Sequence, residues 1–292
     1  MASSTRRADV LAATPTLLDA DGELDARANK ALLSGLAGRV DAVFVAGTTG
    51  EFPGLGLPER SRLLGIALDA FGPEQVVVHV GAAATRDAVA LARDAVAAGA
   101  RRLAVITPYF LAVDATAVSR HFSAVAEVAD GARVYGYLFP ERTGVPADAA
   151  GFAALAAEIG LAGAKLSGSV ADRLPDFVAA LPEDAVLWAG ADTELPAVAR
   201  AGGRGVVASL ASVFPEPFAA LADALAAGDA EAERAAQAGA DEVKAALGGG
   251  IAGLKYALEL MGVGTATMRM PTPGLTAETR ESIARLVARR TG

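Results

Sequence analysis

Residues 76–106 read VVVHVGAAATRDAVALARDAVAAGARRLAVI and contain two strand-like runs on either side of one helical segment. Val76–Val80 and Leu103–Ile106 have the β-branched and apolar composition of strands. Asp87–Ala98, between them, places apolar residues at helical spacing. Short strands that alternate with longer helices are typical of a parallel sheet, because parallel strands need a long crossover connection. This segment therefore predicts an α/β fold.

The same unit recurs along most of the chain. Segments with helical spacing, such as Glu59–Ala70, Ala115–Val128 and Ala149–Glu158, separate the strand-like runs. Eight such strand–helix units over about 220 residues match the size of a (β/α)₈ TIM barrel, which we predict as the fold. An open doubly wound sheet is the alternative, but no G-x-G-x-x-G follows its first strand. The eight runs are Val10–Pro15, Ala42–Ala46, Val76–Val80, Leu103–Ile106, Val134–Phe139, Ala162–Leu166, Val186–Ala189 and Gly205–Ala208.

After the last strand the pattern becomes helical only. The expected helices are Pro217–Ala227, Ala230–Leu247, Ala252–Met261 and Ala277–Ala288. Gly248, Gly249 and Gly250 separate the second of these helices from the third. No Pro-rich or Ser-rich linker separates this part from the barrel. We therefore expect a catalytic barrel over residues 1–228 and a C-terminal helical appendage over residues 229–292.

Composition excludes several classes of protein. Of the 292 residues, 53% are hydrophobic and 21% are charged, as in a folded chain rather than a disordered one. The net charge of -8 has the wrong sign for a protein that coats a phosphate backbone, so no nucleic-acid partner is expected. No apolar stretch approaches the roughly 18 residues of a membrane span, and Met1–Val10 lack the apolar run of a secretory signal. We expect a soluble, cytoplasmic enzyme.

Metal and thiol chemistry have few candidate residues. The chain contains no cysteine, which removes disulfides, thiolate nucleophiles and cysteine-based metal sites. Its only histidines, His79 and His121, are too few for the usual imidazole cluster and have no partners in a recognisable triad. We interpret both histidines as structural and expect no metal.

Lysine is rare, which makes each position conspicuous: Lys30, Lys165, Lys244 and Lys255. Lys165 lies inside the apolar strand Gly163-Ala164-Lys165-Leu166-Ser167. Burial there disfavours the charged amine, and a neutral amine is a nucleophile. The alternative is a strand-end lysine that reaches solvent or pairs with a carboxylate. The other three lie on helical patterns and read as solvated surface residues.

In parallel barrels the chemistry lies where the strands end and the following loops begin. The second strand runs into Gly47-Thr48-Thr49-Gly50-Glu51, whose glycines allow close backbone approach and whose hydroxyls can position an anion. An ordinary glycine turn is the alternative. At the end of the fifth strand Tyr137 can relay protons, and in the next loop Arg142 can bind a carboxylate. The alternatives are a packed aromatic for Tyr137 and a solvated charge for Arg142. The strand ends at 107–110, 190–192 and 207–209 are not diagnostic.

Together and in this order, these residues resemble the dihydrodipicolinate synthase / N-acetylneuraminate lyase family of pyruvate-dependent class I aldolases. Residues 47–51 match the family's G-T-T-G-E loop. Tyr137 to Gly144 match its Y-N-x-P-x-R-T-G stretch, except that Leu138 replaces the asparagine. Gly163-Ala164-Lys165 matches its G-x-K strand. The resemblance extends from about Val10 to Val287.

The resemblance implies a role for each matching residue. Lys165 would be the Schiff-base lysine, Tyr137 the phenol that shuttles protons, and Thr48 the residue that holds Tyr137. Thr49 and nearby backbone N–H groups would bind the carboxylate of pyruvate, and Arg142 a carboxylate of the second substrate. The other positions assigned to substrate binding are Gly47, Gly50, Gly190 and Val207. The family also implies no cofactor beyond the lysine itself, and a homotetramer built from two tight dimers.

Two departures bear on the substrate. Phe110 stands where dihydrodipicolinate synthases carry a second tyrosine that reaches across the dimer interface, and phenylalanine cannot relay a proton. We therefore expect an aldolase or lyase that acts on pyruvate and an aldehyde, or on a 2-keto-3-deoxy sugar acid. Dihydrodipicolinate synthase proper, which condenses pyruvate with aspartate semialdehyde, is the alternative that Arg142 favours. A third reading is an impaired pyruvate-binding or regulatory relative, in which Phe110 and Leu138 mark a lost proton relay.

Overall fold

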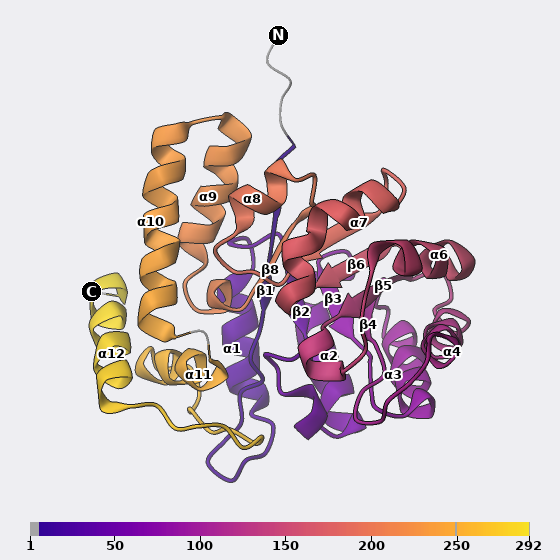
Figure 1. Cartoon of the computed structure of the whole chain (residues 1–292). Helices are drawn as coiled ribbons and strands as arrows, with labels where there is room; N and C mark the ends of the chain where they lie inside the picture. The colour runs from indigo at the N-terminus through magenta and orange to yellow at the C-terminus, as the bar shows by residue number, and fades with distance from the viewer. Residues whose placement is uncertain (1–5, 249, 292) are drawn as a thin grey trace.

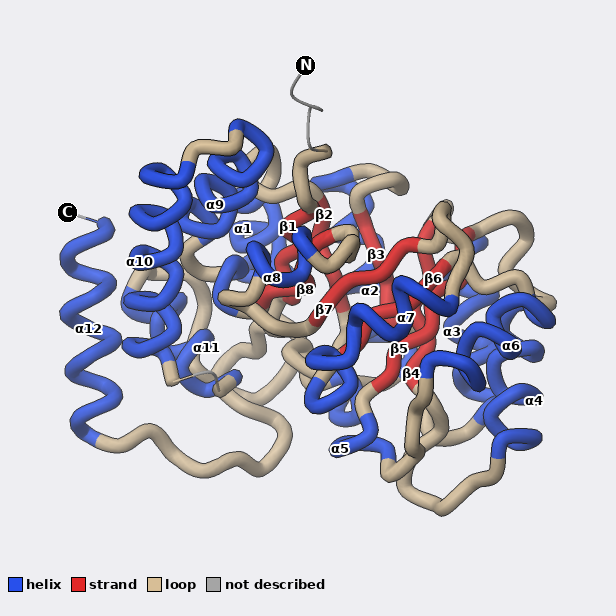
Figure 2. Tube along the Cα trace, turned by 45° about the horizontal axis from the view of Figure 1, so that its top comes forward, coloured by secondary structure: helices blue, strands red, loops and turns tan. Residues whose placement is uncertain are grey.

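A computed structural model describes residues 6–248 and 250–291, and within them eight parallel strands close into a barrel in sequence order. The predicted (β/α)₈ barrel is confirmed, and the strands form the ring at the centre of Figure 2. Closure is carried by the pairing of the first strand with the last, Val10 opposite Val206, which an open doubly wound sheet lacks. The strands are β1 (Asp9–Ala13), β2 (Ala42–Val45), β3 (Val76–His79), β4 (Arg102–Ile106), β5 (Arg133–Leu138), β6 (Gly163–Leu166), β7 (Val186–Ala189) and β8 (Gly205–Ala208).

Helices cover the outside of the barrel (Figure 1). Those that follow strands β1 to β8 are α1 (Ala26–Leu36), α2 (Leu57–Phe71), α3 (Thr85–Ala97), α4 (Ala115–Ala126), α5 (Pro140–Thr143), α6 (Ala149–Ile159), α7 (Leu174–Ala180), α8 (Leu195–Arg200) and α9 (Pro215–Ala227). Short 3₁₀ turns lie at Phe52–Gly54, Gly168–Arg173 and Leu210–Ser212. The predicted strands and helices are all present, with ends that differ by a few residues. The first strand, for example, stops before Pro15, which has no N–H to donate to a ladder.

The C-terminal helices stand together on one side of the barrel (Figures 1 and 2). They are α10 (Ala230–Leu247), α11 (Ile251–Leu260) and α12 (Ala277–Thr291). Gly228, in the left-handed conformation, ends α9, and the side chain of Asp229 then accepts hydrogen bonds from the first turn of α10. Gly249, one of the three glycines expected between the C-terminal helices, lies outside the described residues. Residues 1–5 and Gly292 lie outside them as well.

Side chains along each strand alternate between two apolar cores, because successive residues of a strand point to opposite faces. In β5, Val134 and Leu138 pack between the sheet and the helices, whereas Tyr135 and Tyr137 fill the inside of the barrel. In β6 the neighbours of Lys165 both belong to the outer core. The alternation therefore turns Lys165 toward the inside.

Lys255 corrects a sequence-based prediction. It is not a solvated surface residue, since its side chain is 0% exposed and Nζ donates to Glu51 Oε1 at 2.5 Å and to the Thr267 carbonyl at 2.8 Å. Burial lowers the pKa of Lys255, and the hydrogen bond and negative charge of Glu51 act in the opposite direction. The helical pattern of α11 gives no sign of this contact because both partners come from outside the helix.

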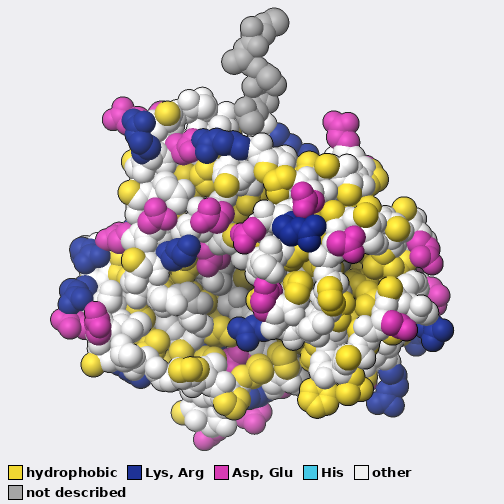
Figure 3. All heavy atoms as spheres, in the orientation of Figure 1, with side chains coloured by type: hydrophobic (Ala, Val, Ile, Leu, Met, Phe, Trp, Pro, Cys, Tyr) yellow, Lys and Arg dark blue, Asp and Glu magenta, His cyan; other side chains and the backbone are white. Residues whose placement is uncertain are grey.

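On the face shown in Figure 3, acidic and basic side chains are interspersed rather than gathered into a basic stripe. Among the described residues, no helix combines the length and the apolarity that a membrane span requires.

The two histidines are buried and bonded. His121 Nδ1 lies 3.0 Å from Thr85 Oγ1, and His79 Nδ1 lies 3.0 Å from the Ala46 carbonyl. Burial lowers the pKa of His121 to about 4 and places the pKa of His79 well below its ordinary value, with the charge of Arg60 adding to the effect at His79. Both imidazoles are therefore neutral at pH 7.

We predict that acid destabilises the fold through His121. Because its pKa is about 4 when folded and about 6.5 when unfolded, the unfolded chain binds more protons between these values, and the free energy of unfolding falls as the pH drops. From pH 7 to pH 5 this group contributes a loss of about 2 kcal/mol. Urea unfolding at each pH measures the free energy of unfolding. The variant His121→Asn keeps a polar partner for Thr85 and should lose this part of the pH dependence. An equal pH dependence of the free energy of unfolding in the wild type and in His121→Asn would contradict the prediction.

Candidate active site

A cavity of about 520 Å³ opens at the carboxyl ends of the barrel strands. Among its walls are seven residues that the sequence singled out: Thr48, Thr49, Tyr137, Arg142, Lys165, Gly190 and Val207. Residues of the C-terminal segment, among them Ile251, Leu254 and Pro273, complete the wall on one side. The cavity is thus enclosed by both the barrel and the segment that follows it.

Lys165 lies at the inner end of this cavity. Its side chain is buried at 5% exposure, and Nζ lies 4.2 Å from the centre of the Tyr137 ring and 4.6 Å from that of Phe44. Within residues 6–248 and 250–291, no side chain forms an ion pair with it or accepts a hydrogen bond from it. The alternatives of a lysine that reaches solvent or pairs with a carboxylate therefore do not describe it. A buried amine that faces a cavity is placed to attack a carbonyl carbon.

Tyr137 stands next to Lys165 because the two are register partners across β5 and β6. Its hydroxyl lies 3.0 Å from Thr48 Oγ1, and either group can donate. The rings of Phe44 and His79 contact the Tyr137 ring edge-on, at centroid distances of 6.0 and 5.8 Å. The phenol is therefore held in one position beside the amine, as a proton relay requires.

The loop after β2 folds tightly around Thr48 and Thr49. Phe52 N–H donates to the Gly47 carbonyl at 3.3 Å, and Thr16 Oγ1 donates to the Gly50 carbonyl at 2.8 Å. A Cβ at position 47 would come within 2.7 Å of the Phe44 ring, so close packing requires glycine there. The two threonines line the cavity, whereas the two glycines lie behind them and shape the loop.

Asp192 and Ser209 were not singled out from the sequence, yet both line the cavity. Asp192 accepts two hydrogen bonds from Ser209, from the backbone N–H at 2.6 Å and from Oγ at 2.9 Å. Burial raises the pKa of Asp192, and the bonds from Ser209 and the charge of Lys165 oppose this rise. Asp192 lies three residues after β7 and Ser209 directly after β8. The strand-end rule reached both segments, but their residue types alone did not mark them as site residues.

Ser167 lines the cavity as well, although it was not singled out from the sequence. Its position shows why residue 190 is a glycine. A Cβ on Gly190 would lie 2.1 Å from Ser167 Oγ and 3.2 Å from Lys165 Cε. Glycine therefore leaves room for both the serine hydroxyl and the lysine side chain.

The remaining predicted positions lie at the rim or away from the cavity. Arg142, on α5, is exposed, and its guanidinium carbon lies 5.7 Å from the centre of the Phe139 ring at the cavity edge. Leu138 belongs to the outer core and points away from the site. Phe110 is 91% exposed and adopts φ +81°, a left-handed conformation that is rare for a bulky residue. Among the described residues, no group of three His, Asp or Glu side chains could hold a metal ion.

Known proteins share this architecture over nearly the whole chain. The model of the dihydrodipicolinate synthetase family matches residues 6–290. An uncharacterized DapA-like lyase of Halobacterium salinarum is 39% identical over 273 residues, which cover 92% of this chain and 89% of that protein.

Two solved structures are similar as well. The crystal structure of dihydrodipicolinate synthase from Aquifex aeolicus has a TM-score of 0.88 and 25% identity, and the match covers 97% of this chain and 98% of that one. The sialic acid aldolase of Ruminococcus gnavus has a TM-score of 0.89 over 98% of each chain, but at 21% identity it shares the fold alone.

The four lysines should differ in reactivity. With formaldehyde and cyanoborohydride, we expect the exposed amines of Lys30 and Lys244 to be methylated first. Lys165 should follow, because it faces a cavity that a small aldehyde can enter, and Lys255 should stay unmodified while the protein is folded. Peptide mapping by mass spectrometry gives the order, and labelling in urea provides the control in which all four react. Methylation of Lys255 at the rate of Lys30 in the folded protein would contradict its burial.

Proposed function

Because this chain belongs to the dihydrodipicolinate synthetase family, we propose that its lyase activity is pyruvate-dependent and proceeds through a Schiff base on Lys165. The observation that carries the proposal is the buried Lys165 amine, unpaired among the described residues, beside the hydrogen-bonded pair of Tyr137 and Thr48. When the amine attacks a ketone, protons must move to the ketone oxygen and away from the amine. The hydroxyls of Tyr137 and Thr48 can donate and accept these protons.

The chemistry uses only groups of this chain and its substrates. The Lys165 amine forms a bond to the ketone carbon of pyruvate, and the oxygen of that carbon leaves as water after it takes up protons through Tyr137. The resulting iminium ion loses a methyl proton to the Tyr137–Thr48 pair and becomes an enamine, whose carbon adds to the carbonyl carbon of an aldehyde. The aldehyde oxygen takes up a proton from the same pair and becomes a hydroxyl. Water then releases the product from Lys165. The reverse sequence cleaves a 2-keto acid into pyruvate and an aldehyde.

Thr49 and the nearby loop backbone support the binding of a carboxylate. The residue lines the cavity next to Thr48, where its hydroxyl can donate to an anion. We assign the carboxylate of pyruvate to this loop, which leaves the ketone carbon directed toward Lys165.

Polar residues that follow β6, β7 and β8 support a polyhydroxylated second substrate. Asp192 presents carboxylate oxygens and Ser209 and Ser167 present hydroxyls, which suit the hydroxyl groups of a sugar chain. A carboxylate such as Asp192 repels a second carboxylate nearby. We therefore propose a 2-keto-3-deoxy sugar acid, or the aldehyde derived from it, as the substrate class.

Dihydrodipicolinate synthase proper is the second candidate, because Arg142 at the cavity rim can bind the carboxylate of aspartate semialdehyde. An impaired pyruvate-binding relative has less support, since Lys165, Tyr137 and Thr48 are all in place and Leu138 points away from the cavity. We also propose the homotetramer of the family, in which a subunit contact would cover Phe110 and Leu111, exposed by 91% and 70%.

Reductive trapping tests the proposal. With pyruvate and borohydride, the peptide that contains Lys165 should gain the mass of a reduced pyruvate adduct. Lys165→Arg should abolish this labelling, whereas Lys30→Arg, the same change at an exposed site, should retain it. Tyr137→Phe should slow trapping roughly 10²-fold, because it removes the proton relay. A wild-type protein whose Lys165 peptide stays unmodified would refute the Schiff-base mechanism.

Steady-state kinetics distinguish the two substrate classes. Asp192→Asn should raise the KM for a polyhydroxylated aldehyde roughly tenfold, the loss expected for one charged hydrogen bond, with a smaller effect on pyruvate. Arg142→Gln should leave that KM nearly unchanged. If the protein instead condenses aspartate semialdehyde with the higher kcat/KM and Arg142→Gln lowers this value, the activity is that of a dihydrodipicolinate synthase.

A further inference from the structure

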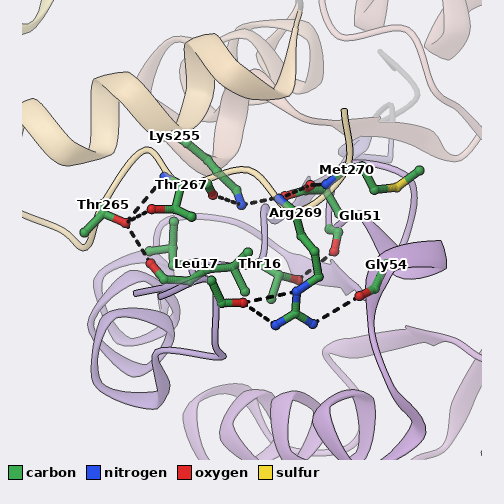
Figure 4. Close-up of polar contacts among 12 residues, drawn as sticks. Thr16, Leu17, Glu51, Gly54, Lys255, Thr265, Thr267, Arg269 and Met270 are labelled. Carbon is green, nitrogen blue, oxygen red and sulfur yellow. Dashed lines mark hydrogen bonds and ion pairs between the residues drawn. The ribbon is translucent and has the colours of Figure 1, made fainter. Parts of the chain in front are cut away.

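The C-terminal segment reaches back over the loop after β2, and their contact centres on Glu51 (Figure 4). Glu51 is the last residue of Gly47-Thr48-Thr49-Gly50-Glu51, and its side chain does not enter the cavity. Figure 4 shows it turned away from the barrel toward Lys255 of α11 and the chain at Arg269 and Met270. The end of the threonine loop is therefore held from outside the barrel.

All three contacts described for the Glu51 carboxylate come from the C-terminal segment. Oε1 accepts from Lys255 Nζ at 2.5 Å, and Oε2 accepts from the backbone N–H groups of Arg269 at 2.9 Å and Met270 at 2.7 Å. Both charges are buried, at 1% exposure for Glu51 and 0% for Lys255. A buried pair with such complete hydrogen bonding fixes its geometry, since loss of either partner leaves an uncompensated charge.

The backbone of Glu51 also needs this support. It adopts φ +55°, in the left-handed region that non-glycine residues seldom occupy. In this conformation its N–H donates to the Thr48 carbonyl at 3.0 Å. Thr48 Oγ1 in turn lies 3.0 Å from the Tyr137 hydroxyl, so a continuous series of bonded groups joins Lys255 to Tyr137.

A second ion pair joins the same segment to the barrel at a distance from the Glu51 contacts. The Arg200 guanidinium at the end of α8 donates to both oxygens of Glu233 on α10, at 2.6 and 2.7 Å. This pair is a natural control, because it ties the C-terminal segment to the barrel and includes none of the residues that bind Glu51.

We propose that Lys255 and Glu51 are positioning residues, through which the C-terminal segment holds Thr48 and Thr49 in place for chemistry at Lys165. Residues 229–292 are then a working part of the site rather than an appendage, which agrees with the place of Ile251, Leu254 and Pro273 in the cavity wall. This inference rests on the proposed Schiff-base function, so its test includes one measurement that does not depend on activity.

The first measurement is hydrogen–deuterium exchange of the full-length protein, followed by mass spectrometry of peptides that cover residues 47–52. Lys255→Met and Glu51→Gln should each increase exchange in these peptides. Glu233→Gln should leave them unchanged, although it weakens another link between the C-terminal segment and the barrel. Unchanged exchange in both Lys255→Met and Glu51→Gln would overturn the anchoring role.

The second measurement is the rate of borohydride trapping of pyruvate over a range of pyruvate concentrations, well below the Tm of each variant. Lys255→Met should slow trapping roughly tenfold and raise the half-saturating pyruvate concentration, because a small displacement of Thr48 and Thr49 impairs both binding and proton transfer. Glu233→Gln should stay within about twofold of the wild type, even where its Tm falls. A folded Lys255→Met protein that traps pyruvate at the wild-type rate would overturn the proposal.

The double variant covers the case in which Lys255→Met does not fold. In Glu51→Gln with Lys255→Met no buried charge is left unpaired, and the amide can accept from both N–H groups while it donates to the freed Thr267 carbonyl. The double variant should fold and should trap pyruvate faster than Glu51→Gln alone. If it traps pyruvate more slowly than Glu51→Gln, the two residues do not act as a pair. If the wild-type protein itself is not labelled, the Schiff-base function fails, and the exchange measurement alone decides whether Lys255 anchors the loop.

Discussion

The pairing of Tyr137 with Lys165 across β5 and β6 is the constraint on which the site depends. Barrel closure fixes this register, and side-chain alternation then turns both residues inward while their neighbours face the helices. A shift of one residue in β6 would send the amine into the outer apolar core. The positions of Lys165 and Tyr137 are therefore fixed by the barrel wall.

The polar groups of the cavity fall into two sets with different chemistry. The threonine loop after β2 offers hydroxyls and backbone to an anion, and Asp192 with Ser209, after β7 and β8, offers acceptors to hydroxyl groups. Lys165 lines the same cavity, which suits a reaction that joins a keto acid to a second, hydroxylated molecule. The C-terminal segment closes the wall and, through Lys255 and Glu51, reaches the same threonine loop.

Much of the fold and part of the site could be predicted from the sequence. The strands were found because valine-rich runs and alanine-rich helices differ strongly in composition, and Lys165 was found because a lysine within an apolar strand is unusual. Lys255 was misjudged since its partner, Glu51, is 204 positions away in the sequence. Asp192 was passed over because a single acidic residue after a strand has no local signal that separates it from a surface charge.

The sequence by itself determined the alternation of strands and helices and the residue types available for chemistry, because periodicity and composition act over neighbouring residues. Only the tertiary structure decided which of these residues meet. Closure of the barrel brought Thr48 to Tyr137, and the return of the C-terminal segment buried Lys255 against Glu51. Such contacts depend on how distant segments pack in three dimensions, and no short-range pattern along the chain encodes them.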